Sequence, residues 1–472
     1  MCTACGKVAA AERSILALRF LPSPFNDNPE YAIGLSIGPR RIGSLGFAIA
    51  TIAVTISPKN VVGEVAMYST LSLASPLSRC TYLYAITLLY FLVAASTVDV
   101  FMTKWTTVVN HPQYSLEKIF AGTEPKPYAF RLLMPLIVNE TFAYAPDKTL
   151  QIFSQRARLA SYRYLYEQNS PPFSWSDDLI IKYGLSGTWF FVFFSATLFL
   201  LRKVAAHVSA SRFLCDVSPI LFALVLPLSF RADGGFIYDF PELFFLSLYL
   251  WLVLMNQRTW ALFLLPLAVL NKETAVLWPL LILFPFAYVM NWEKTLRDTV
   301  LHLALAGVVF IGVHWFFRDV EGCSAEFHLV GNVTFWLDPQ TYLTGLSTGF
   351  PLIPFLKPQH VIFFPLLVMM FFAYWSEKPQ WLRFATGIGF AILLPLVVLF
   401  CYQDEYRNFS LLFPILFLNG VHTISSFLSK SEAAVELRTE ASSGYVLVKT
   451  HDGGAGKDRE KIYMPGPFGS GS

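Results

Sequence analysis

An apolar stretch runs from Trp260 to Met290 and reads WALFLLPLAVLNKETAVLWPLLILFPFAYVM. It is interrupted once, by Asn-Lys-Glu-Thr at 271–274. A charged side chain at bilayer depth costs roughly 2.5–3.5 kcal/mol on insertion scales, so such residues usually face a bundle interior or a wet cavity. Each flank is shorter than the about 20 residues of a complete crossing. The stretch therefore predicts a re-entrant hairpin with the polar tetrad at its tip.

The composition of the whole chain is that of a membrane protein. Of its 472 residues 55% are hydrophobic and 14% are charged, whereas soluble domains are nearer 25% charged. The apolar runs are continuous, while the strands of a transmembrane β-barrel would alternate apolar and polar residues. A dispersed net charge of +3 argues against a nucleic-acid partner. We expect an all-α, polytopic transmembrane helical bundle of about eight to eleven spans, the hairpin included.

Composition also divides the chain into three regions. Residues 1–79 are poorly specified, and residues 80–429 form the predicted transmembrane domain. Residues 430–472 are polar, charged and Gly-rich near their end, so they are predicted to be a disordered cytoplasmic tail.

Basic residues predict the orientation of the helices, because cytoplasmic loops collect Lys and Arg. The residues that mark this side are Arg202, Lys203, Arg212, Arg258, Lys294, Arg297, Lys378, Arg383 and Lys430. They fall on one side only if residues 260–290 enter and leave the membrane on that side. The hairpin tip then lies toward the outer face. We expect a bacterial inner membrane and a cytoplasmic C-terminus.

The outer side is predicted to receive the long segment 101–183, with interfacial helices near 128–142 and 149–167. Shorter outer segments are 231–241, 318–357 and 402–407, the second with a short helix near 342–355. Three N-x-S/T sequons begin on this side, at Asn139, Asn332 and Asn408. They would be acceptors for glycans only in a eukaryotic secretory route.

Two aspartates are candidate catalytic acids or bases. Asp99 ends the first predicted span, where the negative end of the helix dipole and partial desolvation would both raise the pKa of its carboxyl group. Its alternative role is that of an interfacial carboxylate that reaches water. Asp233 lies in the charged turn 231–242 and is the second candidate. In the same turn Asp239 and Glu242 suit the cap and capping-box positions of the next helix.

Three cations are candidate binding residues for a lipid phosphate. Arg131 lies between two prolines in an apolar interfacial helix, and its guanidinium suits bidentate contact with phosphate or carboxylate. Lys272 lies at the hairpin tip, and Arg407 lies in the short loop before the last span. The alternative for each is a local pair with an acidic neighbour, which for Lys272 would be Glu273.

No metal or nucleotide site is predicted. Cys2 and Cys5 form the one C-x-x-C, with no second pair beside it, and the histidines at 111, 328 and 360 are well separated. We find no P-loop, Rossmann fingerprint or zinc-protease motif. We therefore expect no bound cofactor, with a divalent metal left open, and a transferase of this design would take its donor from the lipid phase.

These features together resemble the GT-C superfamily of integral-membrane glycosyltransferases over about residues 82–429. The resemblance rests on an acid after the first span (Asp99), on Pro-Tyr-x-Phe-Arg-x-Leu-x-Pro at 127–135 and on Leu-Asn-Lys-Glu-Thr-Ala at 270–275. The last is similar to the hairpin of lipid-linked aminoarabinose and mannosyl transferases.

The resemblance implies transfer of a sugar from a polyprenyl-phosphate donor to a glycan, lipid or protein acceptor at the outer face. Asp99 would deprotonate the acceptor hydroxyl, and Lys272, Arg131 and Arg407 would hold the departing phosphate. Glu273, Asp239 and Glu242 would support these cations.

Two other functions stay open. A polysaccharide polymerase or ligase would use lipid pyrophosphate donors, and the arginines at 156, 158 and 163 favour it. A transporter or flippase would more often show inverted repeats, and a second half that matches the interrupted hairpin is not found.

Overall fold

The structure is a computed structural model that describes residues 76–102, 115–159, 176–230, 235–323, 325–343, 361, 363–402, 405–443, 446–449 and 460–463. All of them belong to one compact unit, Ile56–Ser472. The predicted N-terminal region 1–79 lies almost entirely outside these residues.

The described part is helical apart from one antiparallel pair of strands, β1 (Val446–Lys449) and β2 (Glu460–Tyr463). Five of its helices are long and apolar enough to cross a membrane, and they span Cys80–Val100, Asp177–Ala205, Trp292–Phe316, Gln380–Phe400 and Tyr406–Ser431. The prediction of an all-helical membrane protein is therefore confirmed. The eight to eleven spans are not reached among the described residues, because several apolar helices are too short.

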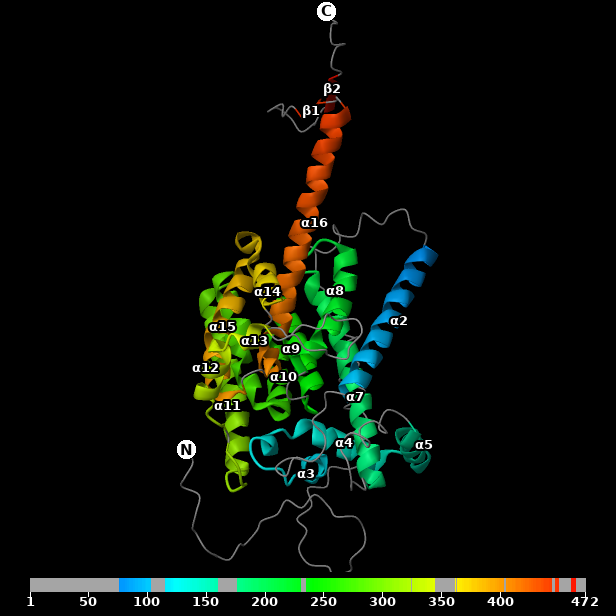
Figure 1. Cartoon of the computed structure of the whole chain (residues 1–472), viewed down its shortest axis with the longest axis vertical. Helices are drawn as coiled ribbons and strands as arrows, with labels where there is room; N and C mark the ends of the chain where they lie inside the picture. Colours follow the sequence, from blue (N-terminus) through cyan, green and yellow to red (C-terminus); the bar gives the residue numbers. More distant parts are fainter. Residues whose placement is uncertain are drawn as a thin grey trace, which may run out of the picture. The chain divides into compact units, whose positions relative to one another are not determined.

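Two of these long helices and two shorter ones form the first part of the bundle (Figure 1). They are α2 (Pro76–Val100), α7 (Asp177–Ala205), α8 (Arg212–Val225, continued by the 3-10 turn η4, Leu226–Phe230) and α9 (Asp239–Leu254). Ser176 and Ser211 cap the starts of α7 and α8 by accepting hydrogen bonds from Leu179 N and Leu214 N. Every residue of α9 from Asp239 to Val253 is buried, so α9 lies in the core of the bundle.

The stretch 260–290 has the hairpin form that the sequence predicts. Its first arm, α10 (Arg258–Asn271), ends where Lys272 adopts an extended backbone, with φ −155° and ψ 126°. The return arm consists of η5 (Glu273–Leu277), η6 (Pro279–Leu283) and η7 (Phe284–Tyr288). Pro279 and Pro285 lack the backbone N–H of a regular α-helix, which accounts for the mixed 3-10 and π geometry of this arm.

Contacts of Arg258 close the open end of this hairpin. Its guanidinium lies 2.8 Å from Asp298 Oδ2, on the first turns of α11 (Trp292–Phe316), and donates to Met290 Sδ at 2.9 Å. Because Arg258 begins the first arm and Met290 follows the second, the chain enters and leaves at the same end. We call this the basic end, and the end that holds Lys272 the hairpin end.

The segment after α2 packs at the hairpin end. It contains α3 (Leu116–Ala121), η3 (Tyr128–Phe130), α4 (Leu133–Tyr144) and α5 (Asp147–Leu159), which gather together in Figure 1. The Leu132 amide donates to Leu270 O at 2.8 Å, and the ring of Phe130 stacks on His314 with centroids 4.0 Å apart. These contacts join the segment to the hairpin and to the last turns of α11.

The last part of the described chain contains α12 (Leu329–Leu337), α13 (Gln340–Leu343), α14 (Phe363–Phe372), η8 (Trp375–Glu377), α15 (Gln380–Phe400), η9 (Tyr406–Leu412) and α16 (Phe413–Ser443). Most of the short helix predicted near 342–355 lies outside the described residues. The tail prediction requires a correction, since α16 continues beyond residue 430 to Ser443. The Ala- and Glu-rich sequence there favours a helix.

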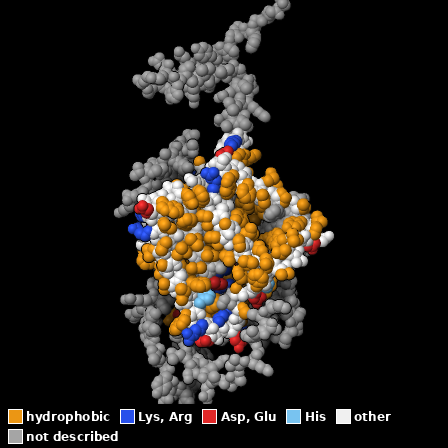
Figure 2. Space-filling view, turned by 90° about the vertical axis from the view of Figure 1, so that its left-hand side faces the viewer, with side chains coloured by type: hydrophobic (Ala, Val, Ile, Leu, Met, Phe, Trp, Pro, Cys, Tyr) orange, Lys and Arg blue, Asp and Glu red, His pale blue; other side chains and the backbone are white. Residues whose placement is uncertain are grey.

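Apolar side chains cover the outside of the bundle. Figure 2 shows them over most of the middle of one face, with charged side chains mainly above and below. On α11 and α12 they include Val308 and Val330, whose relative exposures are 68% and 77%. Exposed apolar surface of this extent on long apolar helices is that of a protein in contact with a lipid bilayer.

The asparagine of one sequon, Asn332, has a structural role. Asn332 is buried, and its Nδ2 donates to Val398 O at 2.8 Å and to Cys401 O at 2.7 Å. These carbonyls end α15 and have no partner within that helix. Asn332 therefore caps a helix, and it is not accessible as a glycan acceptor in the folded chain.

Candidate functional site

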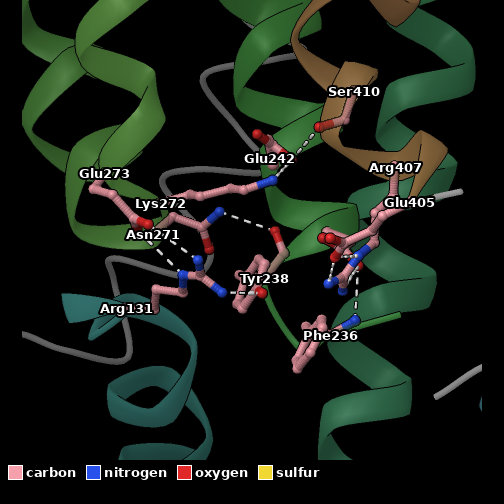
Figure 3. A network of polar contacts seen from close by, with 11 residues as sticks. Arg131, Phe236, Tyr238, Glu242, Asn271, Lys272, Glu273, Glu405, Arg407 and Ser410 are labelled. Atoms are coloured by element: carbon pink, nitrogen blue, oxygen red, sulfur yellow. Dashed lines mark hydrogen bonds and ion pairs between the residues drawn. The ribbon is translucent and has the colours of Figure 1, made fainter. Parts of the chain in front are cut away.

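Three cations from distant segments meet in one buried network at the hairpin end (Figure 3). They are Arg131, just after η3, Lys272 at the hairpin tip, and Arg407 in η9. Their side chains are 12%, 7% and 9% exposed, respectively. The sequence predicts these three residues as phosphate ligands, and the structure brings them together.

Lys272 is neutralised by a residue on the central helix. Its Nζ lies 2.8 Å from Glu242 Oε2, and the same oxygen accepts a hydrogen bond of 2.7 Å from Ser410 Oγ. The alternative pair with Glu273 is not formed. In Figure 3 the side chain of Lys272 extends toward α9, whereas that of Glu273 turns toward Arg131.

Arg131 is held by a carboxylate at the edge of its guanidinium group and by the ring of a tyrosine. Nε and Nη2 donate to the two carboxylate oxygens of Glu273 at 3.2 and 3.0 Å. The guanidinium carbon also lies 4.0 Å from the ring centre of Tyr238, whose hydroxyl accepts a hydrogen bond from Nη1. Asn271 Nδ2 donates to Tyr238 O at 3.0 Å, which fixes this tyrosine to the hairpin tip. Such a bidentate, stacked geometry is specific to arginine.

Arg407 is held by its own loop and by α9. Its Nε donates to Glu405 Oε1 at 2.8 Å, and Nη2 contacts the same oxygen. Its Nη1 lies 3.9 Å from Asp239 Oδ2, beyond hydrogen-bond distance, and its guanidinium covers the ring of Phe236 at 3.9 Å. The local pair considered from sequence is thus present, but it is buried.

The predicted capping roles in the turn before α9 are wrong. The α9 N-cap is Tyr238, with no capping hydrogen bond from its side chain. Asp239 Oδ2 instead accepts from Phe236 N at 2.7 Å, and Glu242 binds Lys272. Glu242 thus pairs with a buried cation, and Asp239 binds a backbone amide of the turn that precedes the helix.

Carboxylates outnumber cations in the network by four to three, since Glu242, Glu273, Glu405 and Asp239 face Arg131, Lys272 and Arg407. Each cation therefore has an acidic partner within the chain. The charge of Lys272 is therefore neutralised within the chain, without an anion from the bilayer. An incoming phosphate would share these cations with the carboxylates.

Several polar atoms around the tip have no hydrogen bond among the described residues although they are buried. They are the acceptors Glu242 Oε1 and Asn271 Oδ1 and the donor groups Arg407 Nη1, Thr274 Oγ1 and Trp278 Nε1. Such atoms are rare in folded proteins and call for a partner, such as water or a ligand. Both donors and acceptors are left over, so water, or a ligand with hydroxyl groups or phosphate oxygens, would complement them.

Of the two candidate acids the structure describes only Asp99, and Asp99 lies outside this network. Asp99 is exposed near the end of α2, and Asp233 is outside the described residues. Asp99 precedes Phe101, whose ring packs on that of Phe240 with centroids 4.7 Å apart. Phe240 follows Asp239 in α9, so the end of α2 is fixed at the hairpin end of the bundle. Direct contact between Asp99 and the three cations is not observed.

The sequence analysis missed Tyr238, Glu405 and Ser410 as parts of the network. Tyr238 and Ser410 are neutral, so the sequence pattern did not single them out. Glu405 lies among other charged residues in a segment that the sequence indicates to be a surface loop. The described residues contain no group of three or more His, Cys, Asp and Glu side chains that could hold a metal ion.

The chain was compared with models of protein families, with curated proteins and with solved structures. None of the three comparisons finds a match.

Proposed function

We propose that this chain is a membrane glycosyltransferase that moves a sugar from a polyprenyl-phosphate donor to an acceptor hydroxyl at the hairpin end. One observation carries the proposal: three cations from separate segments meet at the tip of the hairpin, beside buried polar atoms that have no hydrogen bond among the described residues. The bilayer supplies a lipid-linked donor to a site at this depth.

Arg407 is the cation best suited to take the leaving phosphate. Its Nη1 is buried and makes no hydrogen bond among the residues described, and only a 3.9 Å approach to Asp239 engages it. Negative charge grows on the departing phosphate oxygen as the glycosidic bond breaks, and a fixed guanidinium stabilises that charge. Arg131 and Lys272, which are already paired, hold the hairpin tip in place and add positive potential.

Asp99 is the proposed base. An acceptor hydroxyl must lose its proton as it attacks the sugar carbon, and a carboxylate within reach can accept it. Asp99 lies at the same end of the bundle as the cations, through the packing of Phe101 on Phe240. Asp233 stays the second candidate for this role.

The proposal is tested with purified chain and a panel of radiolabelled polyprenyl-phosphate sugars. We expect transfer by the parent chain and a loss of at least about a hundred-fold in Asp99→Asn, the scale of one general base. Arg318→Ala is the matched control, because Arg318 is an exposed cation that follows α11 and pairs only with its neighbour Asp319 among the described residues. Unchanged sugar transfer by the Asp99→Asn chain would show that Asp99 is not the base.

The same purified chain also tests the two alternative functions, a polymerase or ligase and a transporter. Arg156 and Arg158 lie on α5 at the hairpin end and favour a pyrophosphate donor, so the panel includes polyprenyl-pyrophosphate sugars. Buried, internally paired charges at a broken hairpin also occur in proton-coupled transporters. Proton-driven uptake by reconstituted vesicles, without sugar transfer, would favour that function.

A further inference from the structure

A polar cavity of about 220 Å³ lies at the basic end, between the starts of α10 and α11. Its charged and polar lining includes Asn256, Arg258, Lys294, Arg297, Asp298 and His302. The hairpin arm α10 separates it from the network at Lys272, so the two sites are at opposite ends of the same helix.

Cations dominate this cavity. Arg258 is 8% exposed, lies 2.8 Å from Asp298, and retains a buried Nε without a hydrogen bond among the described residues. Arg297 approaches the same carboxylate only at 3.5 Å. Lys294 has no carboxylate partner in the part of the chain that the structure describes. Three cations thus share one acid, in contrast to the network at the hairpin end, where acids are in excess.

The surface beside the cavity is apolar. Leu301, which lines the cavity, is 53% exposed, and Val300 next to it is 57% exposed. Trp260 and Trp292, in the first turns of α10 and α11 at the same end of the bundle, are 53% and 46% exposed. Tryptophan is enriched at the level of lipid headgroups, so the cavity opens where a headgroup meets its acyl chains.

We propose that this cavity binds the phosphate of an anionic phospholipid whose acyl chains lie along the exposed apolar side of α10 and α11. Lys294 and Arg297 contact the phosphate from the rim, and Arg258 forms the positive floor, oriented by Asp298. Basic pockets between helices at a membrane surface select anionic over zwitterionic lipids by this electrostatic difference. The site is independent of the glycosyltransferase proposal.

The experiment measures lipid binding to the full chain in neutral detergent by native mass spectrometry. Phosphatidylglycerol is compared with phosphatidylcholine, and inorganic phosphate and glycerol phosphate are tested as competitors. We expect phosphatidylglycerol to bind more tightly than phosphatidylcholine, and Lys294→Ala and Arg297→Ala each to lower its affinity by about five-fold. The two water-soluble phosphates should not displace it.

Lys430→Ala is the matched control. Lys430 is an exposed cation at the same end, paired with Glu377 away from the cavity, and its removal changes the net charge by the same amount. The affinity of the Lys430→Ala chain for phosphatidylglycerol should stay within about two-fold of that of the parent chain. Equal phosphatidylglycerol affinity in the parent and in folded Lys294→Ala/Arg297→Ala chains would overturn the proposal. Displacement of phosphatidylglycerol by inorganic phosphate would also overturn the proposal, because the ligand would then be a soluble anion.

Discussion

Lys272 Nζ and Glu242 Oε2 form a buried ion pair at 2.8 Å, although thirty residues separate them in the chain. The pair joins the tip of the hairpin to the start of the central helix α9. Ser410 from η9 donates to the same carboxylate oxygen. Three segments that are far apart in sequence are thus fixed together at one point of the bundle.

Replacing one partner of this pair should destabilise the fold. In Lys272→Met the carboxylate of Glu242 stays buried without its cation, which costs about 3–5 kcal/mol. Thermal unfolding in detergent, followed by circular dichroism, should show a lower Tm. The double variant Lys272→Met/Glu242→Gln should recover most of the loss. A double variant as unstable as the sum of the two single variants would contradict a direct ion pair.

The hairpin form predicts which side of the membrane each loop faces. Asn256 and Asn291 flank the stretch 260–290, and both are exposed at the basic end. Cysteines placed there in an otherwise cysteine-free chain should react with an impermeant maleimide from the same side of a vesicle. Cys323, a free and exposed cysteine after α11, should react from the opposite side when restored. Labelling of the two introduced cysteines from different sides would show that the stretch crosses the membrane.

Glu124 makes stability depend on pH. It is buried in the segment before η3, and neither of its carboxylate oxygens has a hydrogen bond among the described residues. Burial raises the pKa of Glu124 from 4.5 to about 7, against a smaller opposite effect of Lys118. Between about pH 5 and 7 the folded chain therefore binds more protons than the unfolded chain, and stability falls as pH rises.

Glu124→Gln should remove this pH dependence. The variant should be more stable than the parent at pH 8, by about 1–3 kcal/mol, and nearly equal to it at pH 4.5. Tm values measured at both pH values test this, with Glu117→Gln on the neighbouring helix α3 as control. A parent and a variant that differ equally at both pH values would contradict a raised pKa.

Asn332 should behave as a helix cap. In Asn332→Ala two carbonyls at the end of α15 lose their donor, which should cost about 1–3 kcal/mol. The measurement is again the Tm in detergent. When the chain is made in a host that attaches N-linked glycans, peptide mass spectrometry should find Asn332 unmodified in folded protein. A glycan at this position in folded protein would contradict the buried cap.

Much of the fold follows from the length and charge of apolar segments. The hairpin was predictable because its flanks are too short to cross and because basic residues fall on one side only if it returns. The 3-10 and π geometry of η5 to η7 was not, since Pro279 and Pro285 exclude a regular α-helix without determining which other geometry replaces it. The extension of α16 was hidden by the polarity of its sequence.

The cations of the site could be predicted from the sequence, but the residues that pair with them could not. Arg131 and Lys272 stand out because a charge in an apolar segment is rare. Arg407 is a candidate for another reason, since it lies in the short charged loop just before the last apolar span. Partner choice depends on tertiary structure. The extended backbone at Lys272 directs its side chain to Glu242 and leaves Glu273 to Arg131. Tyr238, which contacts the hairpin tip through Asn271, is a neutral residue in a turn and gave no such signal.

The central claim is that the network at the hairpin end holds the phosphate of a polyprenyl lipid. The most direct test is the affinity of the purified chain for polyprenyl phosphate, measured by native mass spectrometry. We predict that Arg407→Gln lowers this affinity about ten-fold or more, and that Glu405→Gln, which removes the carboxylate competing for Arg407, raises it. Arg297→Ala at the other end should leave it unchanged. Equal affinities in the parent, Arg407→Gln and Glu405→Gln chains would contradict the claim.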